Sequence, residues 1–476
     1  MYVLWGLGGM VGLLALAWLL SENRRAIRWR TVLPALAIQA GFGVIVLYWP
    51  AGQQALAFVT RGVQAIIDSS GEGIDFVFGG VLGGEGIEFT FAFQVLPVII
   101  FFASLTAVLY HFGILQFVVE KLGGALGWAL GTRKAESVNA AGNIFVGQTE
   151  APLVIRPYLK GLTRSGLFAV MVGGLSTVAG SVLVGYALLG APLEYLIAAS
   201  FMAAPGALLM AKMILPERLE DRDADDPDLA TPRRRRRKGE AADGRTRVTA
   251  GGSAATEVTD GRTGTPGTGV GDVDTGGGDP AVASGPATPP DDDDILESEE
   301  PSEEGHRNVI DAAASGAADG LRLALTIGAM LLAFISLIAL INLILGAVGG
   351  WFGYPDLTFE QILGYLFAPI MTMIGVPWSE AASAGSFVGQ KVVVNEFVAF
   401  SNFAPIIDEF TPRTAAIITF ALTGFANLGS LGILLGGLGS LIKDRRGEIA
   451  QLGIRAIAAA TLANLMSATI AGILIS

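Results

Sequence analysis

The sequence predicts an all-α polytopic membrane protein with eight transmembrane helices and two re-entrant helical hairpins. The first observation is composition: 52% of the 476 residues are hydrophobic and only 16% are charged, whereas soluble proteins carry about 25% charged residues. The second is that eight segments stay apolar for about 20 residues, the length that crosses the hydrocarbon core of a bilayer. The third is that two further segments are apolar but interrupted by polar residues, glycine and proline.

The eight predicted spans are distributed along the whole chain. They cover residues 2–20, 31–49, 91–112, 166–189, 193–215, 321–348, 415–441 and 454–475. Four clusters of Lys and Arg lie beside these spans, and all four fall on one side of the membrane if the N-terminus starts outside. Because positive charge stays on the cytoplasmic side, we expect a multi-pass plasma-membrane protein with both termini outside.

Residues 216–307 interrupt the apolar pattern. This segment holds 23 of the 43 acidic and 12 of the 31 basic residues and is rich in Gly, Thr, Pro and Asp. So polar a composition cannot bury enough apolar surface to fold, and we therefore expect a disordered, acidic, cytoplasmic insert. Its basic run at 233–238 is expected to act as a topology determinant, or alternatively to touch anionic lipid headgroups.

The composition also excludes several classes of function. With no Cys and only two His, the sequence offers no thiolate and little imidazole for metal binding or catalysis, so we predict that the protein is not an enzyme. Outside residues 216–307 there are 19 basic and 20 acidic residues. This balance predicts no basic surface for nucleic acid.

Two segments are too polar to be ordinary spans, and each begins and ends on the same side of the predicted topology. We call residues 135–162 hairpin one and residues 379–411 hairpin two. Broken backbone at membrane depth is tolerated only against protein or water. Both segments are therefore predicted to be re-entrant helical hairpins.

The order span, hairpin, span, span occurs twice, in residues 91–215 and in residues 308–476. The first copy is predicted to start outside and the second inside, while residues 1–90 supply N-terminal scaffold helices and an interfacial segment. Two inverted repeats with interrupted segments at matching places indicate a secondary transporter with its site near the membrane midplane. A channel is the main alternative, although channels usually repeat by rotation about the membrane normal.

Polar residues concentrate in the hairpins and in the spans that follow them. Hairpin one carries Gln148, Thr149 and Glu150 in succession, and hairpin two carries Asn395 and Glu396. A carboxylate inside the membrane costs several kcal/mol unless it is paired, solvated or neutralised, so we expect both acids to be functional. The alternative is a structural ion pair with Arg156 or Lys391. The span after hairpin two adds an aromatic ring, an amide and a hydroxyl. These groups suit a neutral, polyhydroxylated ligand with an apolar ring.

Four stretches around these polar residues resemble the signature sequences of the concentrative nucleoside transporters. They are GQTEAPLVIRP at 147–157, VAGSV at 178–182, NEFVA at 395–399 and GFAN at 424–427. The resemblance covers the chain outside the insert and implies a homotrimer whose protomers each have a scaffold part and a moving transport part. It implies sodium-coupled symport of nucleosides into the cell by alternating access. Proton-coupled symport and a non-transporting, nucleoside-sensing membrane protein are the alternatives.

The resemblance also implies roles for individual residues. The nucleobase is expected to contact Gln148, Thr149, Glu150 and Val182. The ribose is expected to contact Glu396, Asn427 and Ser430, with Phe425 beside it. Sodium, the implied coupling ion, is expected to bind the side chains of Asn143 and Thr177 and the main-chain carbonyls of Val146 and Val178. Interhelical hydrogen bonds and helix capping are the structural alternatives for the amide and hydroxyl residues.

Overall fold

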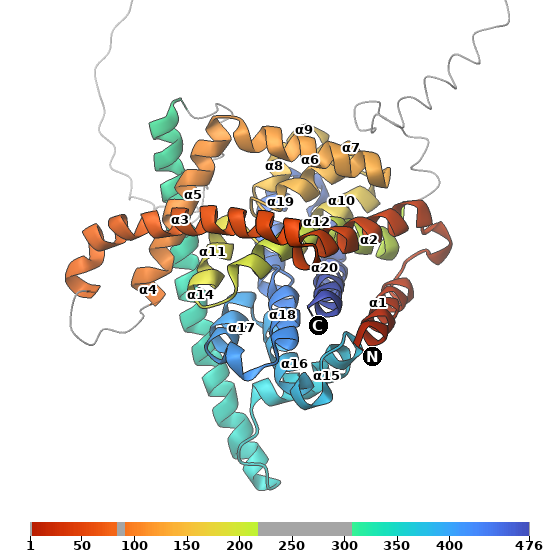
Figure 1. Cartoon of the computed structure of the whole chain (residues 1–476), viewed down its shortest axis with the longest axis vertical. Coiled ribbons are helices and arrows are strands. Elements are labelled where there is room, and N and C mark those ends of the chain that lie inside the picture. Colours follow the sequence, from red (N-terminus) through yellow and green to blue (C-terminus); the bar gives the residue numbers. More distant parts are fainter. Residues whose placement is uncertain (1, 83–90, 218–306, 476) are drawn as a thin grey trace, which may run out of the picture. The chain divides into compact units, whose positions relative to one another are not determined.

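Helices make up nearly all of the regular structure in the computed structural model (Figure 1), which describes residues 2–82, 91–217 and 307–475. No strand occurs within these ranges. The prediction of an all-helical protein is thus confirmed for the described residues. The insert predicted for residues 216–307 lies, except at its two ends, outside them.

Three helices precede the first predicted repeat. They are α1 (Tyr2–Leu19), α2 (Trp29–Gly43), which a π-helical segment (Val44–Tyr48) continues, and α3 (Pro50–Leu82). α3 is 33 residues long, but polar residues recur along it. Its apolar stripe is therefore too narrow for a span and is typical of a helix lying at the membrane surface. The sequence indicated an interfacial segment here but did not show that it forms one continuous helix. In Figure 1, α3 lies across α5.

Helices α4 to α12 form the first half of the remaining chain. Their bounds are α4 (Phe91–Gln94), α5 (Leu96–His111), α6 (Ile114–Leu130), α7 (Lys134–Gly142), α8 (Ala151–Val154), α9 (Arg156–Leu159), α10 (Arg164–Ser176), α11 (Gly180–Leu188) and α12 (Leu193–Ile214). Hairpin one consists of α7, the turn at its tip, α8 and α9. The sequence analysis did not predict α6, because Glu120 and Lys121 interrupt its apolar sequence.

The second half repeats this order of elements. Its helices are α14 (Val309–Trp351), α15 (Phe359–Met373), α16 (Trp378–Val393), α17 (Glu396–Phe403), α18 (Pro412–Leu422), α19 (Leu428–Leu441) and α20 (Arg446–Leu474). Hairpin two consists of α16, α17 and the 3-10 segment Ala404–Glu409. The sequence analysis did not predict α15, which precedes α16 with a bend of 117° between them. In both halves two helices (α5 and α6, or α14 and α15) are thus followed by a hairpin, an interrupted helix and a final helix, although the opposite orientation of the halves across a membrane remains a prediction.

Two predicted spans are interrupted rather than continuous. The span predicted at 166–189 is split into α10 and α11, and that at 415–441 is split into α18 and α19. A threonine follows the first helix of each pair, and its hydroxyl donates to the carbonyl four residues earlier, at 2.9 Å for Thr177 and 2.7 Å for Thr423. The resemblance to the concentrative nucleoside transporters implied that both spans are broken, whereas threonine and glycine within apolar sequence are by themselves too weak a signal to locate the breaks.

Burial separates the helices into a core and a periphery. The most apolar 18-residue windows of the α10–α11 segment and of α12 are each 94% buried, whereas that of α14 is only 11% buried. α5 and α14 lie side by side (Figure 1), and a Cβ atom at Gly320 of α14 would lie 2.7 Å from the Cα of Ile100. α14 therefore presents one side to the protein and leaves most of its apolar surface to lipid or to another chain.

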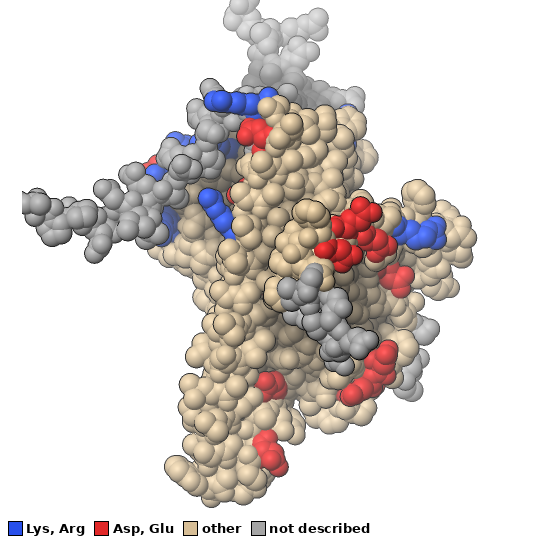
Figure 2. All heavy atoms as spheres, turned by 90° about the vertical axis from the view of Figure 1, so that its left-hand side faces the viewer, with Lys and Arg blue, Asp and Glu red and all other residues tan. Residues whose placement is uncertain are grey.

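Six helices in the described residues are long and apolar enough to cross a membrane, or seven if the bent pair α15–α16 counts as one span. The number of eight spans therefore remains a prediction, as do the positions of the two termini. On the face drawn in Figure 2, Lys and Arg side chains gather in the upper half and only Asp and Glu are visible in the lowest part. Such an asymmetry is what the positive-inside rule leads us to expect.

Candidate functional site

The two interrupted helices meet at their breaks. The backbone N–H of Phe425, in the second break, donates to the carbonyl of Thr177, in the first, at 3.1 Å. Asn464 of α20 joins both breaks, because its Nδ2 donates to the carbonyl of Ser176 at 2.7 Å and to that of Thr423 at 2.9 Å. Since the last carbonyls of a helix have no partner within the helix, this cross-connection stabilises two helix ends in the middle of an apolar core.

The tip of hairpin one packs against the first break. The N–H of Gly180, which begins α11, donates to the carbonyl of Phe145 at 3.1 Å. Gly174 of α10 permits the close approach, because a Cβ atom there would lie 2.7 Å from the Cβ of Gln148. The hairpin tip and the break in the helix are thereby held as one unit.

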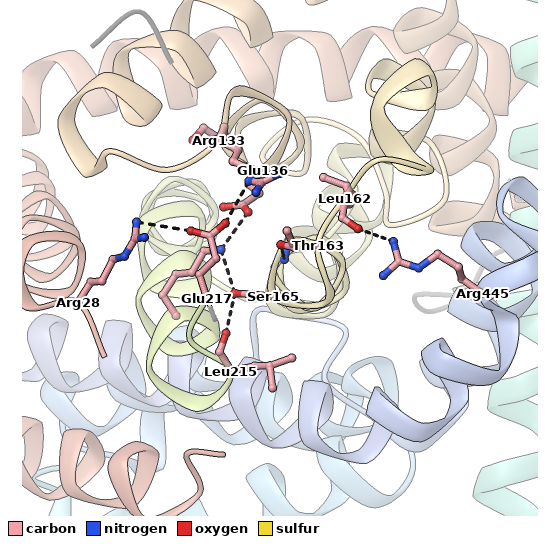
Figure 3. Close-up of polar contacts among 12 residues, drawn as sticks. Arg28, Arg133, Glu136, Leu162, Thr163, Ser165, Leu215, Glu217 and Arg445 are labelled. Carbon is pink, nitrogen blue, oxygen red and sulfur yellow. Dashed lines mark hydrogen bonds and ion pairs between the residues drawn. The ribbon is translucent and has the colours of Figure 1, made fainter. Parts of the chain in front are cut away.

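The base of hairpin one is fixed by buried ion pairs (Figure 3). Lys212 of α12 donates to Glu136 of α7 at 2.9 Å, and Glu217 lies 3.0 Å from Arg133 and 3.5 Å from Arg28. Lys212 also donates to the hydroxyl of Ser165 at the start of α10, at 3.1 Å. Breaking a buried ion pair is strongly destabilising. These contacts therefore hold the hairpin base against the start of α2, the start of α10 and the end of α12.

One cavity lies between the two hairpin tips, the two breaks and α14. All eight residues that the sequence analysis proposed for substrate line it: Gln148, Thr149, Glu150, Val182, Glu396, Phe425, Asn427 and Ser430. Gly147, Ala179, Asn395, Phe397 and Ile433 also line it. So do five residues of α14 that were not expected from the sequence: Leu323, Thr326, Ile327, Met330 and Leu331. They lie in a predicted span whose sequence is almost wholly apolar, and Thr326 is the single polar signal among them.

Glu396 is the most firmly held polar group of the cavity. It is 4% exposed and begins α17, where the positive end of the helix dipole stabilises a carboxylate. The hydroxyl of Tyr186 donates to its Oε1 at 3.0 Å, and Nδ2 of Asn427 donates to its Oε2 at 2.7 Å. Each carboxylate oxygen has a further lone pair, so Glu396 can still accept two hydrogen bonds from a ligand.

Asn427 has two functions. While its Nδ2 donates to Glu396, its Oδ1 accepts the N–H of Ser430 at 2.7 Å and so caps α19. Asn395 caps α17 in the same way, through the N–H of Val398 at 2.9 Å. Capping had been the structural alternative for Asn143 and Thr177, and an interhelical hydrogen bond the one for Asn427. The interhelical bond, from Asn427 to Glu396, is present and accompanies a position of Asn427 on the cavity.

Glu150 differs from Glu396 in its surroundings. Its side chain lines the cavity but is exposed, although both acids were expected inside the membrane. Gln148, two residues earlier, is 4% exposed, and its Oε1 accepts no hydrogen bond from any described residue. An orphaned acceptor in a cavity is costly to leave unsatisfied, and a ligand N–H or O–H placed there would satisfy it.

A set of oxygen atoms lies next to the cavity, at the tip of hairpin one and the first break. Asn143 is completely buried, and its Oδ1 accepts no hydrogen bond from the described residues. Thr177 is 1% exposed, and its hydroxyl donates to Gly173 while keeping its lone pairs. The carbonyls of Val146 and Val178 accept no backbone hydrogen bond in the described chain.

This donor set fits the cation that the sequence analysis expected there. Hard cations prefer oxygen ligands, and divalent ones are usually held by several carboxylates. The four donors are neutral, and no group of three His, Cys, Asp or Glu residues that could hold a metal occurs in the described ranges. Neutral oxygens from a side chain, a hydroxyl and two carbonyls suit a monovalent ion such as sodium.

The second break requires glycine at position 424. Gly424 has φ +157°, and a Cβ atom there would lie 2.4 Å from Oδ1 of Asn464 and 2.8 Å from the carbonyl of Ser176. We therefore expect Gly424→Ala to destabilise the protein by about 1–3 kcal/mol and to lower ligand affinity. The thermal melting of the purified protein would show the loss, with Gly432→Ala on α19, where a Cβ atom meets nothing within 4 Å, as control. Equal melting of the two variants would contradict this interpretation.

Comparisons with known proteins identify the family. Residues 8–81 match the model of the Na+ dependent nucleoside transporter N-terminus, residues 92–193 the Gate model for nucleoside recognition, and residues 282–472 the model of the Na+ dependent nucleoside transporter C-terminus. The chain is 48% identical to the uncharacterized transporter YutK of Bacillus subtilis, with 100% of both chains covered. It is 41% identical to the nucleoside permease NupC of Helicobacter pylori, covering 98% of this chain and 96% of the relative.

Solved structures agree with this assignment. The structure of CNTnw in an inward-facing substrate-bound state is 46% identical, has a TM-score of 0.79, and is matched over 100% of this chain and 98% of that chain. Three kinds of comparison therefore support the same family. These are the three family models, two relatives matched over at least 96% of their own length, and a solved structure. The chain belongs to the concentrative nucleoside transporters.

Proposed function

We propose that this protein is a symporter that couples the inward movement of sodium to the uptake of nucleosides by alternating access. The observation that carries the proposal is that all eight residues expected to bind the substrate line one cavity, beside a neutral set of oxygen donors at the same hairpin tip. The two sites share the tip of hairpin one and the first helix break, so occupation of one must affect the other.

Substrate recognition divides the cavity into two sides. Glu396, with Asn427 and Ser430 next to it, offers acceptors and donors of the kind that bind a pair of ribose hydroxyls. Gln148, Thr149 and Glu150 approach from hairpin one and offer both amide and carboxylate groups to the edge of a nucleobase. Val182 and Phe425 contribute apolar contact with the rings.

Coupling follows from the shared segment. A sodium ion bound by Asn143, Thr177 and the carbonyls of Val146 and Val178 would join the tip of hairpin one to the break between α10 and α11. This would place Gln148 and Thr149 for the nucleobase, so sodium raises nucleoside affinity. By thermodynamic linkage, the nucleoside raises sodium affinity by the same factor.

Alternating access would require one part of the protein to move against another, and the difference in burial between the core helices and α14 suggests where the two parts meet. The hairpins and the interrupted helices form the transport part, and α14 with α5 belongs to the scaffold against which the transport part moves. The little-buried surface of α14 is available for lipid and for the neighbouring protomers of a homotrimer. The membrane potential adds about 2.3 kcal/mol per elementary charge per 100 mV to the driving force.

Replacing external sodium by choline at constant pH is expected to stop the uptake of radiolabelled uridine into proteoliposomes. A sodium gradient should support accumulation above the equilibrium concentration, and counterflow should be measurable when unlabelled uridine is inside. Uptake sustained by a proton gradient in choline would show a proton-coupled symporter instead. Binding of uridine without uptake or counterflow would show a sensing protein and overturn the proposal.

A further inference from the structure

Lys391 is a completely buried lysine that the mechanism described so far does not use. It lies in α16, the first helix of hairpin two, and has no exposed surface. Its Nζ donates to the carbonyl of Ala421 at 2.7 Å and to Oδ1 of Asn464 at 2.7 Å. These two contacts are with neutral oxygens, so this ammonium group is held as a bound cation would be.

One oxygen belongs to the end of the second interrupted helix, and the other belongs to Asn464 of α20, which contacts that end. Ala421 lies in the last turn of α18, where the carbonyls lack helical partners and form the negative end of the helix dipole. Asn464 holds the chain just beyond, through the carbonyl of Thr423 at 2.9 Å. The ammonium group therefore neutralises the end of α18 in the middle of the core.

The first interrupted helix ends in a closely similar arrangement. Thr177 follows α10 as Thr423 follows α18, and both hydroxyls donate to the carbonyl four residues earlier. In each half a hairpin brings one polar side chain close to this end. Hairpin one brings the neutral Asn143, whose Oδ1 has no donor among the described residues, whereas hairpin two brings Lys391.

We propose that Lys391 is a positioning residue whose ammonium group acts as a tethered cation at the end of α18, and that it is the counterpart, at the same end of the helix although not on the matching atoms, of a free sodium ion at the end of α10. The proposal rests on the sodium-coupled function proposed above and deepens it. One half of the protein carries its cation covalently, and the other must bind it from solution. Each chain therefore takes up a single coupling ion.

Asn464 gives the two cation positions a direct connection. Its Oδ1 accepts from Lys391, and its Nδ2 donates to the carbonyl of Ser176, the neighbour of Thr177. Loss of the ammonium group would leave this Oδ1 without its donor, and a shift of the amide would disturb both breaks. Lys391→Met, which removes the charge and adds no oxygen, should therefore weaken nucleoside binding by about 5- to 150-fold, the range of typical coupling between sites.

The decisive variant is Lys391→Asn, which shortens the side chain and places a neutral oxygen where hairpin one has Asn143. We expect sodium to occupy the vacated position beside the Ala421 carbonyl. In proteoliposomes, the charge moved per nucleoside should rise from about one to about two, and the Hill coefficient for sodium should rise likewise. Purified Lys391→Asn should also gain more thermal stability from sodium than either the unmodified protein or Lys391→Met.

The outcomes separate this proposal from the proposed function. Lys391→Asn that melts with no greater sodium dependence than Lys391→Met, or that gives no folded protein in sodium buffer, would overturn the tethered cation. The same conclusion would follow if Lys391→Met bound uridine as tightly as the unmodified protein. The proposed function is tested by uridine uptake of the unmodified protein in sodium and in choline, a measurement that does not involve Lys391.

Discussion

Glu396→Gln is expected to abolish measurable nucleoside uptake. The carboxylate accepts from Tyr186 and Asn427 and has lone pairs left for two ligand hydroxyls. Glutamine has only one acceptor oxygen, and its amide group would face either the Asn427 amide, which is also a donor, or the Tyr186 hydroxyl. Since a hydrogen bond to a charged group contributes about 1.5–3 kcal/mol, losing two should weaken binding by a factor of about 100 or more.

The measurement is the kcat/KM of uridine uptake together with the dissociation constant of uridine in detergent. Glu120→Gln is a matched control, because Glu120 is an exposed glutamate on α6, away from the cavity. Tyr186→Phe removes one of the two hydrogen bonds but leaves the carboxylate, so its effect should be intermediate. Normal uptake by Glu396→Gln at normal expression would refute the assignment of Glu396 to the ribose.

The sequence was sufficient to predict eight residues that line one cavity, but not how deeply each of them is buried. Gln148, Thr149, Glu150, Glu396, Asn427 and Ser430 were recognisable because polar groups inside a membrane span are costly and therefore mark function. Which of the two acids is buried depends on how the helices pack around the cavity, and this packing cannot be read from the sequence. Glu150 is exposed there, whereas Glu396 is enclosed by α17 and its two donors.

Other features could not be predicted because their signals are weak or shared between distant segments. The cavity wall from α14 is apolar, and an apolar residue that faces a ligand has the same sequence pattern as one that faces lipid. The breaks at Thr177 and Thr423 are stabilised by Asn464, more than 40 residues away from the nearer of them. The sequence shows a lysine at position 391, but only the structure shows that its partners are the neutral oxygens of Ala421 and Asn464.

Asn143→Leu is expected to remove the sodium dependence of nucleoside binding. Leucine keeps approximately the volume of the side chain and removes the Oδ1 that accepts no hydrogen bond from the described residues. The fold should tolerate the change, because the carbonyl of Asn139, which accepts from Nδ2 of Asn143 at 2.9 Å, also accepts from the backbone N–H of Asn143 at 3.0 Å. Any loss of function can therefore be assigned to the ion site.

Calorimetric titration of uridine in sodium and in choline measures this coupling directly. If sodium organises the tip of hairpin one, the affinity of the unmodified protein should differ between the two salts by about 5- to 150-fold, and that of Asn143→Leu should be equal in both. Thr177→Ser keeps the hydroxyl and should retain the difference, whereas Thr177→Val keeps the shape without the hydroxyl and should lose most of it. Because serine and valine differ from threonine by one group each, a sodium effect that survives in Thr177→Val would place the ion elsewhere.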